Sequence, residues 1–271
     1  MQALKKFLVL PADLLMLAGQ KRLQADYGNL RTAQSLELVV MLAPLDEWPN
    51  VADTLAGLME RGQNSPSVSG ALNRGDRRAI YGIVRALKPA RILEIGTHIG
   101  SSTVHIAAAL RENSAEGRPG TLTTVDVIDV NSARAPWALS GMKRSPRQMV
   151  DSLGMGEQVT FRACDSISFL QSCNDRFDFV FLDGSHAAKS VYNEIPLVQR
   201  CLNAGAVILL HDFFPDGKPL WPGLRPLPGP WLAYARLRRE GAPIRAVPLG
   251  SLPWPTKAGT NVTSLALLGS T

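Results

Sequence analysis

The chain has 271 residues, of which 45% are hydrophobic and 19% charged, and its formal net charge is +6. This hydrophobic content excludes an intrinsically disordered protein, and the length allows one sizeable core with a small appendage rather than two full domains. The basic residues are scattered and accompany no recognised nucleic-acid module. We therefore expect no nucleic-acid partner.

Cysteine usage and hydropathy bear on location. Three cysteines, Cys164, Cys173 and Cys201, stand in no metal-ligand spacing, and their odd number argues against a disulfide framework. Pro11 and Asp13 interrupt the apolar run near the N-terminus, and no segment is long enough to span a bilayer. We expect a cytoplasmic protein with no membrane span. The N-terminal run either packs as a helix or touches a membrane surface weakly.

The first 74 residues have an amphipathic helical pattern in pieces, with apolar clusters around Leu14, Leu36 and Val51. The polar stretch from Arg61 to Ser69 predicts a linker. We predict an N-terminal helical region at residues 1–74 and a main domain at residues 75–271. The helical region either caps the main domain's site or forms a contact in a homo-oligomer.

From Asp76 onward, stretches with helical spacing alternate with short apolar runs. Strands that alternate with helices predict a parallel sheet covered on both faces, and two late strands without a helix between them predict an antiparallel edge. The fold class is therefore α/β, with a doubly wound, mostly parallel seven-stranded sheet. The predicted strands are residues 91–95, Leu122 to Val127, Gln158 to Ala163, Phe177 to Leu182, Ala206 to Leu210, Ile244 to Leu249 and Asn261 to Leu268; the predicted helices are residues 76–87, Ser101 to Glu112, Pro146 to Leu153, Ser166 to Gln171, Ala187 to Leu202 and Trp231 to Arg239.

A glycine-containing turn, residues 94–100 with the sequence EIGTHIG, leaves the first predicted strand and enters a helix. Glycines let the backbone turn sharply and approach a ligand, and the helix N-terminus offers free N–H groups. A dinucleotide turn would read G-x-G-x-x-G, whereas here Glu94 precedes the first glycine. Its carboxylate would repel a phosphate and suits a cationic or hydroxyl-bearing ligand. The simpler alternative is a tight strand-to-helix connection without a ligand.

Three further carboxylates, Asp126, Asp165 and Asp183, each follow a predicted strand at the same edge of the sheet. Ligands of open α/β sheets bind beyond this edge. Asp126 is placed to accept the ribose hydroxyls of an adenosine, and Asp165 to meet an adenine amino group. Any one of them alone fits a helix N-cap equally well. Together with Glu94 they favour a ligand site.

On these residues, the chain from about Asp76 onward resembles the class I S-adenosylmethionine-dependent methyltransferases. The segments FLDGSH (181–186) and GAVILLHD (205–212) are similar to bacterial small-molecule O-methyltransferases, including relatives of the macrocin and catechol types. The resemblance implies a Rossmann-like methyltransferase fold, S-adenosylmethionine as cofactor, and methyl transfer to a hydroxyl of a small-molecule or glycosidic acceptor. The residues expected to bind the cofactor are Glu94, Gly96, Thr97, Gly100, Ser102, Asp126, Cys164, Asp165, Ser166 and Asp183.

Such relatives often bind a divalent ion at the ends of the fourth and fifth strands, which implies a Mg²⁺ site at Asp183 and Asp212. His211 stands where an acidic or Asn neighbour is expected, and this departure counts against an oxygen-ligand site. A hydroxyl acceptor must also lose its proton. His186 is our preferred general base and His211 the second candidate, with a structural hydrogen-bonding role as the alternative for each.

The segment from Phe213 to Tyr234 is rich in proline and aromatic residues, and it predicts either a wall or lid of the acceptor pocket or a plain surface connection. Two other functions stay open for the chain. One is a Rossmann-like oxidoreductase, which Glu94 and the glycine spacing disfavour. The other is a cofactor-fold subunit that binds without catalysis.

Overall fold

The computed structural model describes residues 9–36, 45–62, 71–221, 227–257 and 259–271. Its centre is a seven-stranded sheet with the order β3-β2-β1-β4-β5-β7-β6. The strands are β1 (Arg91–Ile95), β2 (Thr121–Asp126), β3 (Val159–Ala163), β4 (Phe177–Leu182), β5 (Leu202–Leu210), β6 (Ile244–Pro248) and β7 (Ala266–Ser270). The helices are α2 (Val9–Ala18), α3 (Ala33–Leu36), α4 (Trp48–Leu58), α5 (Arg74–Leu87), α6 (Ser101–Ala115), α7 (Pro136–Leu139), α8 (Pro146–Ser152), α9 (Ser166–Ser172), α10 (Ala188–Gln199), the short 3₁₀ helix η1 (Pro215–Gly217) and α11 (Gly229–Arg239).

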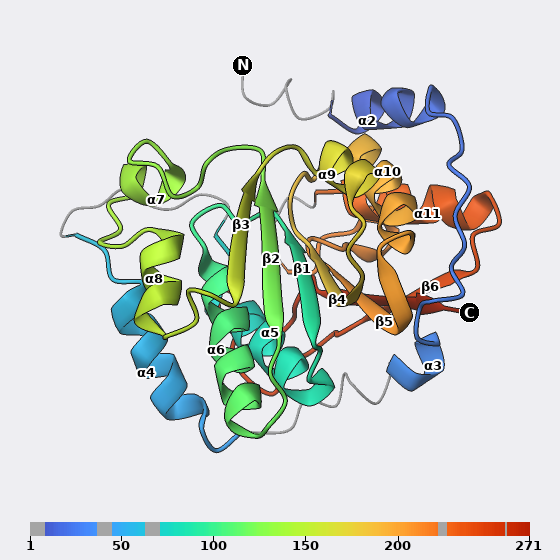
Figure 1. The fold of residues 1–271 in the computed structure, drawn as a ribbon. Helices are drawn as coiled ribbons and strands as arrows, with labels where there is room; N and C mark the ends of the chain where they lie inside the picture. Colours follow the sequence, from blue (N-terminus) through green and yellow to red (C-terminus); the bar gives the residue numbers. More distant parts are fainter. Residues whose placement is uncertain (1–8, 37–44, 63–70, 222–226, 258) are drawn as a thin grey trace.

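The predicted doubly wound sheet is confirmed. The first five strands pair in parallel, and β7 lies antiparallel between β5 and β6. Helices cover both faces: α4, α5, α6 and α8 lie on one side of the sheet, and α9, α10 and α11 on the other (Figure 1). Successive side chains of a strand point to opposite faces, so the central strands must be apolar at every position.

Strand β4 illustrates this arrangement. Phe179 and Phe181 belong to the core cluster that contains α5 and α6, whereas Val180 and Leu182 belong to the cluster that contains α10 and α11. All four side chains are buried. The continuous apolar run in the sequence therefore reflects burial on two faces rather than one.

Two predicted strand starts were wrong by four or more residues. Strand β5 begins at Leu202, whereas the sequence predicted Ala206 and a longer preceding helix. The last strand begins at Ala266 rather than Asn261. Before Ala266, the side chains of Thr263 and Ser264 bond to Asp76 and Asp212 at the carboxyl edge of the sheet, so this stretch leaves the ladder.

The N-terminal part of the chain packs closely on the main domain. Leu30 forms a bridge to Ala206 of β5, and Thr32 forms one to Ser270 of β7. Leu36 and Leu55 are buried in the same core cluster as α5 and α6. The division at residue 74 stays a prediction, and most of the predicted linker from Arg61 to Ser69 lies outside the described residues. Within the described ranges, no helix combines the length and apolar character needed to cross a bilayer.

Candidate active site

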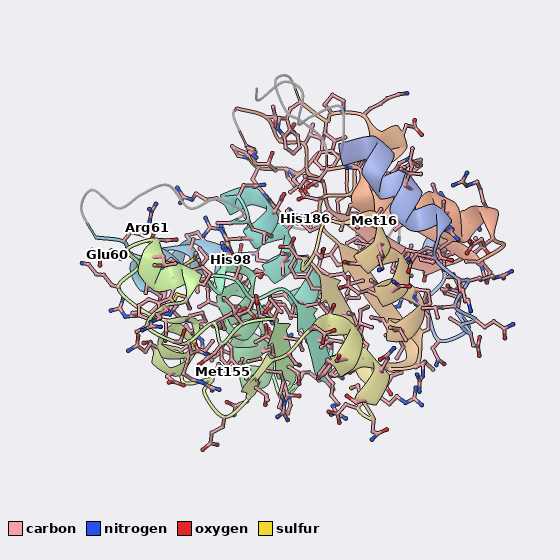
Figure 2. The ribbon with its side chains drawn as sticks, turned by 90° about the horizontal axis from the view of Figure 1, so that it is seen from above. Met16, Glu60, Arg61, His98, Met155 and His186 are labelled. Atoms are coloured by element: carbon pink, nitrogen blue, oxygen red, sulfur yellow. The ribbon has the colours of Figure 1, made fainter. Side chains whose placement is uncertain are left out.

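A cavity of about 560 Å³ opens at the carboxyl ends of β1, β2 and β4. This is the edge at which open α/β sheets bind ligands, and a volume of about 300–1,000 Å³ suits a small molecule or cofactor. Figure 2 looks onto this edge and places His98 and His186 near its centre. The residues that line the cavity are Leu72, Ile95, Gly96, Thr97, His98, Ser101, Ser102, Val125, Asp126, Val127, Cys164, Asp165, Ser166, Ile167, Asp183, Gly184, Ser185, His186 and Ser190.

Both predicted loop glycines are required by the backbone. Gly96 has a φ of +97°, and a Cβ there would overlap the carbonyl oxygen of Asp183. Gly100 has a φ of +77°, and a Cβ there would lie 2.8 Å from the Cβ of Pro146. Gly96 lines the cavity, whereas Gly100 begins α6 and packs against α8. Of the two, only Gly96 brings the backbone to the cavity wall.

Asp126 at the end of β2 organises the loop after β1. Its Oδ2 accepts hydrogen bonds from the backbone N–H of Thr97 at 3.1 Å and of His98 at 2.9 Å. Its Oδ1 accepts a longer bond from Ile128 at 3.3 Å. A carboxylate offers about four lone-pair sites, so capacity remains for a ligand hydroxyl. Asp126 lines the cavity, and its predicted role in cofactor binding stays a prediction.

Glu94 lies behind the loop rather than at the cavity wall. Its side chain is fully buried, and Thr103 and Thr124 donate hydroxyl hydrogen bonds to Oε2 at 2.6 Å each. Burial raises the pKa of Glu94 from 4.5 to about 7, although hydrogen bonds from Ser102, Thr103 and Thr124 oppose the rise. Ser102 lines the cavity, so Glu94 supports the wall through its neighbours.

The three predicted residues after β3 line the cavity together. The backbone N–H of Cys164 donates to the carbonyl of Asp126 at 2.8 Å, and the Ser166 hydroxyl donates to Glu194 at 2.6 Å. Asp165 caps α9, because its Oδ1 accepts from the N–H of Ser168 at 2.9 Å. That hydrogen bond also lowers the pKa of Asp165. The N-cap role and the cavity position occur at the same residue.

His98 faces the cavity. Its backbone φ of +50° is a value that residues other than glycine rarely adopt. Its Nδ1 atom is buried and has no hydrogen-bond partner among the described residues. Burial lowers the pKa of its imidazole. A neutral, unpartnered ring nitrogen in a strained loop is a feature of ligand sites.

The ends of β4 and β5 carry a second group of functional side chains. His211 Nδ1 lies 2.8 Å from Asp183 Oδ1, and its Nε2 lies 3.5 Å from Oδ2 of Asp76 on α5. Burial lowers the pKa of His211, but the carboxylate of Asp183 and hydrogen bonds to Asp183 and Asp76 outweigh it and hold the pKa well above its usual value. An imidazole that carries protons on both nitrogens cannot accept another, which favours His186 as the base.

His186 sits at the mouth of the same region. Its Nδ1 lies 3.5 Å from Asp212 Oδ2, and 38% of its side chain is exposed. The loop that carries it is held by α11, where a Cβ on Gly229 would overlap the His186 carbonyl oxygen. His186 therefore combines access to the cavity with a carboxylate on one ring nitrogen.

Comparison with known proteins agrees with this geometry. The sequence pattern of the methyltransferase domain family matches residues 93–213, which includes the glycine loop and the ends of β1 to β5. Residues 93–213 of this chain therefore match a methyltransferase domain. The match agrees with the family that the sequence motifs resemble.

Two relatives are O-methyltransferases by name. The rhamnosyl O-methyltransferase of Mycobacterium tuberculosis is 29% identical over 162 residues, which cover 58% of this chain and 59% of the relative. The chain thus matches less than two thirds of the length of that relative. A probable O-methyltransferase of the same organism is 25% identical over 196 residues, covering 71% of this chain and 77% of the relative.

Solved structures confirm the methyltransferase fold. The O-methyltransferase TomG of Streptomyces achromogenes, solved with S-adenosylmethionine, has a TM-score of 0.55 at 17% identity and covers 89% of this chain and 96% of its own. An O-methyltransferase of Bacillus cereus, solved with S-adenosylhomocysteine, has a TM-score of 0.52 at 17% identity and covers 89% and 98%. At this identity the likeness concerns the fold alone.

The side chains at the ends of β4 and β5 do not fit the predicted Mg²⁺ ion. Asp183 directs an oxygen at the ring of His211. In the part of the chain that the structure describes, no three His, Cys, Asp or Glu side chains are grouped so as to hold a metal. Mg²⁺ requires near-octahedral oxygen ligands at about 2.0–2.1 Å, and here an imidazole separates the two carboxylates. The prediction of a metal site at Asp183 and Asp212 therefore lacks support.

Among its described residues, the aromatic segment after β5 does not line the large cavity. The ring centroids of Phe213 and Trp231 are 5.5 Å apart, as are those of Phe213 and Tyr234. These rings pack into the core cluster of α10 and α11, and no described residue of the segment lines the cavity. Residues 222–226 lie outside the described ranges.

Several site residues were missed from the sequence. Val127 and Ile167 give the cavity apolar walls, and each lies within four residues of a strand end, which is a signal that could have found them. Leu72 precedes α5 and no local pattern marks it. Asp76 was read only as the start of a helix, yet it reaches His211.

Proposed function

We propose that this chain is an S-adenosylmethionine-dependent O-methyltransferase that acts on a hydroxyl of a small-molecule or glycosidic acceptor. The observation that carries the proposal is one cavity with two chemically different ends. Asp126 lines it at the end of β2, the glycine loop lines it after β1, and His186 lines it after β4, on the other side of β1 in the strand order. The methyltransferase domain family match supports the same assignment.

The residues at the first end fit an adenosyl group. Gly96 has no room for a side chain, so the backbone itself forms the wall. Asp126 offers acceptor capacity for ribose hydroxyls, and the apolar side chains of Val127 and Ile167 suit an aromatic base. His98 lines the same cavity, and its buried Nδ1 has no hydrogen-bond partner among the described residues. When bound, S-adenosylmethionine supplies a methyl group on a positively charged sulfur.

At the other end, the protein must orient an acceptor oxygen and remove its proton. Orientation alone can supply roughly 7–11 kcal/mol for a displacement of this kind. A proton on His186 Nδ1, facing Asp212, leaves Nε2 as the acceptor nitrogen for the hydroxyl proton. Asp212 then stabilises the imidazolium that forms. The acceptor oxygen gains the bond to the methyl carbon as the carbon–sulfur bond breaks.

The relationship to a rhamnosyl O-methyltransferase supports a glycosidic acceptor within this class. Because the identity is 29% over 59% of that relative, a glycosidic acceptor is a proposal for this chain and is not transferred from the relative. Cytoplasmic location and a homo-oligomer stay predictions from the sequence.

Two measurements test the proposal. Calorimetry with S-adenosylhomocysteine should give a single binding site, whereas NAD(H) should give no heat. Mass spectrometry should then detect a methylated product from a panel of rhamnosides, other glycosides and catechols. Binding of a nicotinamide in place of the adenosyl compound would favour an oxidoreductase. Cofactor binding without methylation of any acceptor type would favour a binding subunit.

A further inference from the structure

Three carboxylates converge on one imidazole at the ends of β4 and β5. Nδ1 of His211 lies 2.8 Å from Asp183 and 3.6 Å from Asp212, and Nε2 lies 3.5 Å from Asp76. The exposed fractions of the Asp76, Asp183 and Asp212 side chains are 1%, 9% and 16%. Buried carboxylates at such spacing need a cation between them. The His211 side chain occupies that position.

Asp76 is built into this cluster rather than placed there by chance. Its Oδ1 accepts a hydrogen bond from the hydroxyl of Thr263 at 2.6 Å, and its Oδ2 accepts one from the amide of Asn73 at 2.6 Å. The two donors lie far apart in the sequence, one just before α5 and one shortly before β7. Together they hold the carboxylate against Nε2 of His211.

The backbone around His211 is also specialised. Asp212 follows β5 with a φ of +50°, which an L-residue adopts at some cost. This conformation lets adjacent residues face one cluster: Asp212 reaches both His211 and His186, while Ser264 donates to its Oδ1 at 3.3 Å. The strained backbone of Asp212 lies where the segments after β4, after β5 and before β7 meet.

We propose that the imidazole of His211 replaces the divalent cation that an oxygen-ligand site would hold between Asp183 and Asp212, so that this methyltransferase needs no resident metal ion. The inference rests on the proposed function for its catalytic meaning, but its structural part stands on the cluster alone. Because both ring nitrogens face carboxylates, His211 acts as a fixed internal cation. It positions Asp183 and Asp212, and through Asp212 it positions His186.

The first test measures metal binding without any acceptor. Electron paramagnetic resonance and calorimetry with Mn²⁺ should detect no site in the wild-type chain, and a chelator should leave its methyl transfer unchanged. His211→Glu places a fourth carboxylate at the cation position and should create one Mn²⁺ site. The matched control, His211→Gln, has a similar size without charge and should create none.

Each outcome decides the inference. A wild-type Mn²⁺ site that disappears in Asp183→Asn would overturn it. So would a His211→Glu variant that is folded by circular dichroism, binds S-adenosylhomocysteine and still takes no Mn²⁺. Failure of the proposed function appears elsewhere, as a wild-type chain that does not bind S-adenosylhomocysteine at all.

Discussion

The main-chain N–H of His98 lies 2.9 Å from Oδ2 of Asp126, so the end of β2 fixes the loop that follows β1. The same carboxylate faces the cavity. The Asp126 side chain therefore fixes the loop after β1 and also lines the cavity.

Asp126→Ala should weaken binding of S-adenosylhomocysteine by about ten- to a hundredfold, since a hydrogen bond to a charged group contributes about 1.5–3 kcal/mol. Calorimetry measures the affinity. Asp129→Ala is the matched control, because Asp129 is an exposed carboxylate three residues along that bonds only to the nearby backbone N–H of Asn131 in the described contacts. Equal affinities of wild type and Asp126→Ala would remove Asp126 from the cofactor site.

Gly96→Ala should lower the free energy of unfolding and abolish cofactor binding. The φ of +97° costs an alanine about 1–3 kcal/mol, and its Cβ also overlaps the Asp183 carbonyl. Gly117→Ala separates these effects, because Gly117 has a φ of +75° with open space around the Cβ position. Denaturant unfolding should rank Gly96→Ala below Gly117→Ala, and the reverse order would argue against the close approach of the loop to β4.

His186→Ala should lower kcat by about 10²–10⁴-fold, the usual contribution of a general base, while the affinity for S-adenosylhomocysteine stays the same. His186→Gln preserves a polar side chain of similar reach but cannot take a proton, so it should be equally slow. Full turnover in either variant would exclude His186 as the base. A parallel loss of cofactor affinity would indicate a structural role.

The buried carboxyl of Glu94 should make stability depend on pH. Its pKa in the folded protein is about 7, against 4.5 as its ordinary value, so its stabilising contribution is present below about pH 4.5 and is lost as pH rises through 7. Between about pH 5 and about pH 8, wild type should lose on the order of 3 kcal/mol of unfolding free energy relative to Glu94→Gln. Glu157→Gln, at an exposed position, should follow wild type. Parallel pH curves for wild type and Glu94→Gln would contradict the shifted pKa.

Leu36→Ala tests whether the N-terminal region shares the main core. Leu36 is fully buried against β7, so truncation should cost about 2–5 kcal/mol in one cooperative unfolding transition. Leu139→Ala, at a side chain that is 71% exposed, should have little effect. A separate early transition, with the main transition unmoved, would support two independent regions divided near residue 74.

Much of the fold could be predicted because its signals are local. Phe177 to Leu182 is apolar at every position except Asp178, which is typical of a buried strand, and the glycine spacing places the loop after β1. The start of β5 could not be predicted from the sequence. Asn203, Ala204 and Gly205 form no apolar run, and the strand begins where Leu202 pairs with Phe177 of β4.

The site residues also differ in how far the sequence alone could predict them. Asp126 and Asp183 follow strand ends, so topology alone brings them to one edge. Asp76 is 135 residues before His211, and its role depends on Thr263 near the other end of the chain. A contact of this kind has no local pattern, so the cluster could not be predicted in full from the sequence.

The strand order β3-β2-β1-β4-β5 has a consequence for specificity. In the function we propose, the nucleoside side of the cavity is built on β1 and β2, while the histidine and aspartate cluster is built on β4, β5 and α5. Substitutions that adapt the second half to a new acceptor need not disturb the first. A scaffold partitioned in this manner can diversify its substrates while keeping a common methyl donor.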